Sequence, residues 1–80
     1  MPHKVDKAMG TVLRRLRKNA EVTQGVLAER AGLSYPQIQK YESGKNRISI
    51  SRLFELAEAL NTTASKIITL VEFEIEVENF

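Results

Sequence analysis

The sequence has no cysteine and no tryptophan, and it has only two prolines and one histidine among its 80 residues. Without cysteine there can be no disulfide and no thiolate metal site, and the lone His3 has no partner at metal-ligand spacing. These absences exclude disulfide-stapled secreted domains and zinc modules built on thiolates. They favour a cytoplasmic protein that carries no metal and no other cofactor.

Long apolar runs are missing as well. No segment approaches the ~18 consecutive apolar residues of a membrane span. The opening MPHKVDK lacks the apolar core of a signal peptide, so we expect a soluble, unprocessed chain without a membrane partner. The sequence also shows no recognisable set of catalytic residues, because there is no thiol, no Gly-rich phosphate loop, and only a terminal histidine. We predict one domain that is not an enzyme.

Acidic residues are scarce in the first part of the chain, and basic residues are scarce in the second. From Met1 to Arg52 there are eleven basic and four acidic residues, a net charge of +7. From Leu53 to Phe80 a single Lys66 stands against six glutamates, a net charge of −5. This asymmetry favours a polyanion-binding N-terminal part and an acidic C-terminal part. The alternative is that the charged residues only form solvated surfaces, which would give the same net charges.

Apolar spacing and capping residues predict five short helices. The first helix shows the i, i+3, i+4, i+7 stripe of an amphipathic helix, with Asp6 placed to cap it. The second, third and fourth helices each begin at a hydroxyl flanked by two apolar residues five positions apart, and the fifth begins at a threonine. The expected caps are Thr23, Ser34, Ser49 and Thr63, and the expected left-handed stops are Gly32, Gly44 and Asn61. The predicted helices cover residues 6–19, 24–31, 35–43, 50–60 and 64–69.

The apolar period changes to two after the fifth predicted helix. Val71, Phe73, Ile75 and Val77 alternate with four glutamates. This alternation of β-branched and aromatic residues predicts a strand within an acidic tail of residues 71–80, following a helical domain of residues 1–70. A lone strand has two unpaired edges. It therefore pairs with its copy across a dimer axis, docks on a partner protein by β-augmentation, or remains a disordered acidic tail.

Residues 24–43, QGVLAERAGLSYPQIQKYES, have the organisation of two helices joined by a tight turn. A helix-turn-helix needs small residues where its helices cross, a glycine in the turn, and apolar residues on its inner faces. Every one of these positions is occupied by a suitable residue. The small residues are Ala28 and Ala31, the turn residue is Gly32, and the inner faces carry Leu27, Leu33, Ile38 and Tyr41.

This unit closely resembles the XRE-type helix-turn-helix family of the lambdoid phage repressors. Besides residues 24–43, the resemblance is carried by Met9-Gly10, Leu16-Arg17, Thr23-Gln24 and Glu42-Ser43-Gly44, and it covers residues 9–68. It implies a mainly α, five-helix domain that binds operator DNA as a symmetric dimer, with its third helix in the major groove. The predicted C-terminal strand adds to that fold.

The resemblance also implies roles for individual residues. Gln24 matches a glutamine that touches a backbone phosphate, and Gln39 and Lys40 are expected to read adenine and guanine edges. Tyr35 and Pro36 depart from the polar base-reading residues of the phage repressors and suit a thymine methyl instead. The remaining positions are Gln37 at the backbone or groove edge, a phosphate clamp of Lys45, Asn46 and Arg47, and a structural salt bridge between Arg17 and Glu42. Arg14, Arg15 and Lys18 either contact phosphates or form a solvated face.

We therefore predict a sequence-specific DNA-binding transcriptional regulator, a repressor that occupies a palindromic operator as a homodimer. The alternative is an antitoxin-type or other protein-interaction module whose C-terminal strand docks a partner protein and whose DNA binding is secondary. The DNA-binding domain is expected to cover residues 1–70. The predicted dimer interface consists of Ile67, Ile68, Val71, Phe73, Ile75 and Val77, with Phe54 as a further candidate.

Overall fold

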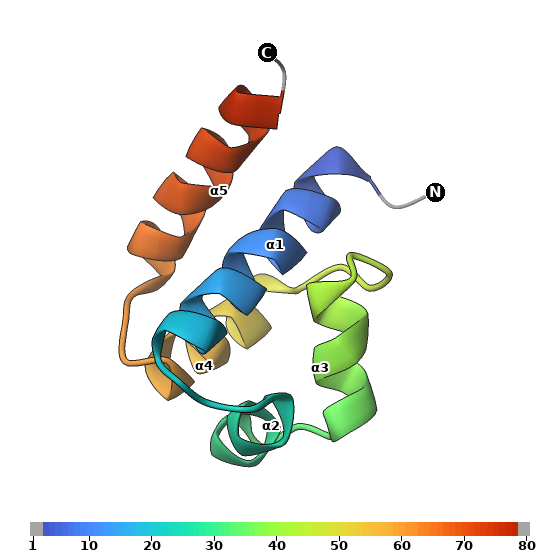
Figure 1. Cartoon of the computed structure of the whole chain (residues 1–80), viewed down its shortest axis with the longest axis vertical. Helices are drawn as coiled ribbons and strands as arrows, with labels where there is room; N and C mark the ends of the chain where they lie inside the picture. Colours follow the sequence, from blue (N-terminus) through green and yellow to red (C-terminus); the bar gives the residue numbers. More distant parts are fainter. Residues whose placement is uncertain (1–2, 79–80) are drawn as a thin grey trace.

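The computed structural model describes residues 3–78. They form five helices, namely α1 (Lys4–Asn19), α2 (Gln24–Ala31), α3 (Tyr35–Glu42), α4 (Ile50–Ala59) and α5 (Ala64–Glu78) (Figure 1). All five predicted helices are present, and the first four agree with the predicted bounds to within two residues. α1 packs against both α3 and α5, while α2 contacts α3 and α4. Within residues 3–78 no helix is both long and apolar enough to cross a membrane.

The hydroxyl caps and left-handed stops are confirmed. Thr23, Ser34, Ser49 and Thr63 each accept a hydrogen bond from the backbone N–H three residues further on, at 3.1 to 3.3 Å. These bonds satisfy amides that the first turn of a helix leaves free. Gly32, Gly44 and Asn61 have φ of 68°, 79° and 59°. The local sequence therefore determines where α2 to α5 begin and where the chain turns.

The start of α1 corrects the sequence-based prediction. His3 is the N-cap, because its Nδ1 accepts a hydrogen bond from Val5 N at 3.1 Å. Asp6 lies inside the first turn, and its carboxylate accepts hydrogen bonds from Arg47 instead of from backbone amides. The prediction of Asp6 as the cap is therefore wrong. Its carboxylate is paired with Arg47, a loop residue 41 positions further along the chain, and not with the backbone amides of the first turn.

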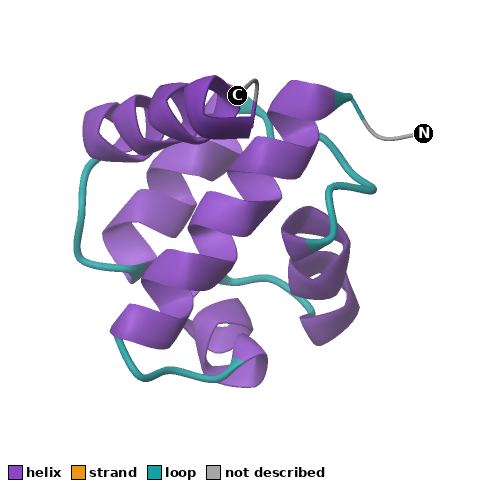
Figure 2. Cartoon of the chain, turned by 45° about the horizontal axis from the view of Figure 1, so that its top comes forward, coloured by secondary structure: helices purple, strands orange, loops and turns teal. Residues whose placement is uncertain are grey.

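Residues 71–78 form the second half of α5, so the predicted strand is wrong. No strand is present between residues 3 and 78 (Figure 2), and residues 79–80 of the predicted tail lie outside the described range. Apolar residues that recur every two positions also recur every four, and residues four apart lie on the same face of a helix. Ile67, Val71 and Ile75 have this spacing and form one row on α5. This row packs against the cluster around α1 and α4. The helix also pairs the backbone groups that a lone strand would leave open.

Two apolar clusters lie on either side of α1. Val12 belongs to the cluster shared with α4 and α5, and the adjacent Leu13 belongs to the cluster that holds α2 and α3. Leu27, Ile38 and Tyr41 are buried in the second cluster, as expected for the inner faces of the helix-turn-helix. α1 therefore acts as a central support that fixes α2 and α3 relative to the rest of the molecule.

Candidate nucleic-acid interface

The turn between α2 and α3 leaves the outer face of α3 open to solvent. Gly32 ends α2 in the left-handed conformation, and Leu33 N donates to Ala28 O at 2.8 Å. Ser34 then caps α3. Because Ile38 and Tyr41 are buried, the opposite side of α3 faces outward, with Gln37 half-buried. The exposed residues there are Tyr35, Pro36, Gln39 and Lys40.

A groove of ≈ 450 Å³ runs beside α3. Cations reach it from three segments: Arg14 from α1, Lys40 from α3, and Lys45 from the loop that follows. The other lining residues are Gln24, Pro36, Gln39, Glu42 and Ser43. Across the described part of the chain no cluster of acidic or histidine side chains could hold a metal ion. The groove combines positive charge with amide donors and acceptors, which suits the phosphate backbone and base edges of DNA.

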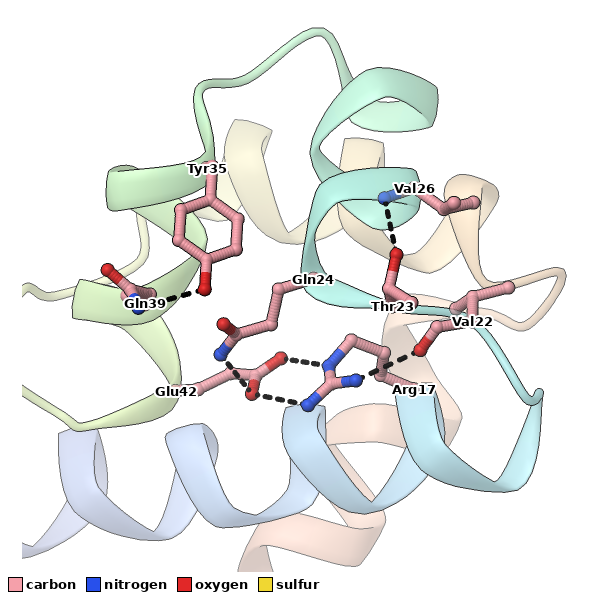
Figure 3. Close-up of polar contacts among 8 residues, drawn as sticks. All are labelled: Arg17, Val22, Thr23, Gln24, Val26, Tyr35, Gln39 and Glu42. Atoms are coloured by element: carbon pink, nitrogen blue, oxygen red, sulfur yellow. Dashed lines mark hydrogen bonds and ion pairs between the residues drawn. The ribbon is translucent and has the colours of Figure 1, made fainter.

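A polar network joins the three helices behind this groove (Figure 3). Arg17 Nε donates to Glu42 Oε2 at 2.6 Å, Arg17 Nη2 donates to Glu42 Oε1 at 3.1 Å, and Arg17 Nη1 donates to Val22 O at 2.9 Å. Gln24 Nε2 donates to Glu42 Oε1 at 3.0 Å. The side chains of Arg17 and Glu42 are only 11% and 4% exposed. A bidentate pair of this geometry fixes the angle between α1 and α3 and orients the amide of Gln24.

The exposed face of α3 carries a second polar contact. Gln39 Nε2 donates to Tyr35 Oη at 3.2 Å, one turn apart on the same helix (Figure 3). The sequence favoured an apolar contact of Tyr35 with a thymine methyl, and the structure also places its hydroxyl against a residue predicted to read bases.

The loop after α3 carries the three residues of the predicted phosphate clamp, and they do not all lie at the groove. Lys45 lines the groove, and the exposed Asn46 is tied to α3 by a bond from its N to Lys40 O at 3.3 Å. Arg47 lies elsewhere. Its guanidinium donates three hydrogen bonds of 3.2 Å to the Asp6 carboxylate, and these bonds and the charge of Asp6 raise the pKa of Arg47. The structure therefore brings Lys45 to the groove and places Arg47 against the first turn of α1.

Three α1 cations, Arg14, Arg15 and Lys18, were left undecided by the sequence, and they have different surroundings. Arg14 lines the groove beside α3, whereas Arg15 pairs with Glu74 of α5 at 3.0 Å. Lys18 lies with Arg14 and Arg15 in a neighbouring hollow. Arg14 is the groove residue that the sequence left undecided. The available signal was its position three residues before Arg17, which places both on one face of α1.

The residues predicted for the dimer interface fall into three groups. Ile67 and Val71 are buried in the core of the subunit itself, and Ile75 is half-buried. Ile68, Phe73 and Val77 are exposed. Two further apolar residues, both on α4, are exposed: Ile50, 66% exposed, was not predicted as interface, and Phe54, 62% exposed, was a further candidate. Ile50 and Phe54 lie four residues apart on a helix whose buried residues form a separate row. This spacing was the sequence signal for a second apolar face.

The fold and the groove define a helix-turn-helix protein. Residues 13–67 match the family described as "Helix-turn-helix". The chain belongs to this family, the XRE-type or Cro/C repressor-like transcriptional regulators. The family consists of DNA-binding regulators and not of enzymes.

Relatives and solved structures agree with this assignment. An uncharacterized transcriptional regulator in the ATPase CF(0) region of Rhodospirillum rubrum is 50% identical over 58 residues, which cover 72% of this chain and 54% of that protein. An HTH-type regulator of Sinorhizobium medicae is 38% identical over 80% of this chain and 46% of its own length. The chain thus spans about half the length of these curated relatives.

Two solved structures share the fold over most of their length. The clp gene regulator ClgR of C. glutamicum superposes with a TM-score of 0.83 and 25% identity, over 90% of this chain and 92% of that one. The restriction-modification controller protein C.AhdI of Aeromonas hydrophila gives 0.74 and 28%, over 76% and 92%.

Proposed function

We propose that this protein binds a specific, palindromic DNA operator as a homodimer and represses transcription by occupying it. The observation that carries the proposal is the row of exposed polar residues on α3 beside a groove that holds Arg14, Lys40 and Lys45. An α-helix with such a face fits the major groove, where Gln39 and Lys40 reach base edges. Arg14, Gln24 and Lys45 then lie where the phosphate backbone passes.

The groove cations and the α3 amide make different contributions, and substitutions separate them. Lys45→Ala is expected to weaken binding to all duplexes alike and to lower the slope of log affinity against log salt by about 1, because one phosphate contact is lost. Gln39→Ala is expected to cost about 1 to 3 kcal/mol on the preferred site and to leave random DNA unaffected. Fluorescence anisotropy with selected and scrambled duplexes at several salt concentrations measures both.

Lys66→Ala is the matched control for Lys45→Ala. Lys66 is also an exposed lysine, but it lies on α5 and does not line the groove beside α3. Its removal is expected to leave the salt slope unchanged. Equal effects of Lys45→Ala and Lys66→Ala would mean that the groove is not where DNA binds.

The proposed dimer uses the exposed apolar residues of α4 together with Ile68. Ile50 and Ile68 line one cavity of ≈ 440 Å³ with Arg47, and Phe54 follows Ile50 by one helical turn. This surface adjoins the loop that carries Lys45. A second copy docked there covers the apolar side chains and places both α3 helices near the dimer axis, as a palindromic site requires. Of the interface residues considered from the sequence, this proposal keeps Ile68 and Phe54.

Phe54→Glu is expected to weaken self-association about tenfold or more, because it buries a charge at the centre of the interface. Phe73→Glu is the matched control. Phe73 is 64% exposed, similar to Phe54, but lies five residues after Ile68, about 140° around the axis of α5. Sedimentation equilibrium measures both. A larger effect from Phe73→Glu would place the interface on the other side of α5.

The alternative of a strand that docks a partner protein is no longer supported. It depended on an unpaired strand edge at residues 71–77, and these residues are helical. We therefore keep DNA binding as the single proposed function.

A further inference from the structure

We infer that the hydroxyl of Tyr35 holds the amide of Gln39 and thereby sets which base Gln39 reads. This inference rests on the proposed function, in which α3 reads DNA. The contact that carries it is the hydrogen bond from Gln39 Nε2 to Tyr35 Oη at 3.2 Å (Figure 3). Both side chains lie on the exposed face of α3, with Tyr35 50% exposed, so neither is held there by burial in the core.

A glutamine amide has two N–H donors and one carbonyl acceptor. One N–H of Gln39 goes to Tyr35, which leaves one N–H and the carbonyl oxygen for a base. This is the donor and acceptor pair that fits N7 and the N6 amino group of adenine. A free amide can rotate and direct its NH₂ group at the O6 and N7 acceptors of guanine. Tyr35 therefore restricts Gln39 to the adenine pattern.

DNA binding makes this restriction matter. On the free protein, water competes for both partners, and an exposed hydrogen bond contributes little. In the major groove much of that water is displaced, and an amide N–H without an acceptor is then unfavourable. Tyr35 Oη supplies this acceptor from within the protein. Its own hydrogen stays available to donate to a base acceptor.

Tyr35→Phe tests the inference, because it removes the hydroxyl and keeps the ring. Preferred duplexes are first selected from a randomised pool with the full chain. The base pair that Gln39 reads is the position that Gln39→Ala relaxes. At that position, Tyr35→Phe is expected to lower the preference for adenine over guanine about 3- to 10-fold, with affinity for random DNA unchanged. In a Gln39→Ala background, Tyr35→Phe is expected to have no further effect there.

Three results would overturn the inference, and they differ in what else they overturn. If Tyr35→Phe keeps the full adenine preference while Gln39→Ala abolishes it, Tyr35 does not position Gln39 and the proposed function stands. If Tyr35→Phe changes the preference only at other positions, its hydroxyl reads a base directly. If the unaltered protein selects no sequence, the proposed function fails together with the inference.

Discussion

Replacing Gly10 with alanine is expected to cost about 3 kcal/mol or more of the free energy of unfolding, because α1 and α3 touch through their backbones at this residue. A Cβ at Gly10 would lie 2.5 Å from Tyr41 O and 2.6 Å from Glu42 O. Both atoms belong to the backbone of α3, so no side chain can move aside. The whole end of α3 would have to shift away from α1.

Gly25→Ala is the matched control. A Cβ at Gly25 meets only Thr23 Oγ1, at an ordinary 3.8 Å, in the exposed first turn of α2. Alanine is the better helix former, so Gly25→Ala is expected to stabilise the fold by about 0.5 kcal/mol. Urea unfolding followed by circular dichroism measures both variants. A Gly10→Ala protein as stable as the unaltered chain would contradict the backbone contact between α1 and α3.

The local features of this fold follow from the sequence because their causes are local. A capping hydroxyl satisfies amides two or three residues away, and a left-handed glycine acts at its own position, so the bounds of α2 and the turn at Gly32 were predictable. Asp6 and Arg47 are the opposite case, because they contact each other although they lie 41 residues apart in the sequence. No local pattern shows that these two groups meet, so the ion pair between them was not predicted.

The helix at residues 71–78 was missed for a different reason. Alternation fits a strand, but it also contains the i, i+4 row that a helix needs, so the pattern alone does not decide. What decides is the partner surface. The row of Ile67, Val71 and Ile75 meets the apolar side of α1 and α4, and Glu74 reaches Arg15 at 3.0 Å. A strand at the same place would have had no neighbouring strand among residues 3–78 to pair with.

Glu42→Ala is expected to cost about 3 kcal/mol of the free energy of unfolding, because it leaves the charge of Arg17 with an 11% exposed side chain and no carboxylate partner. Arg17 would keep only its bond to Val22 O at 2.9 Å. Gln24 would lose its acceptor in the same step, so its amide would no longer be fixed toward the groove. Thermal or urea unfolding measures the loss of stability.

Glu55→Ala is the matched control, because the Arg52–Glu55 pair is solvent-exposed at 33% and 52%. An exposed pair contributes little, so a change below about 0.5 kcal/mol is expected. Adding Arg17→Met to Glu42→Leu separates charge from packing, since two apolar side chains leave no buried, unpaired charge. That double variant is expected to regain most of the stability that Glu42→Ala loses. If it remains as unstable as Glu42→Ala, the network stabilises the fold through its ion pair itself and not merely by avoiding a buried, unpaired charge.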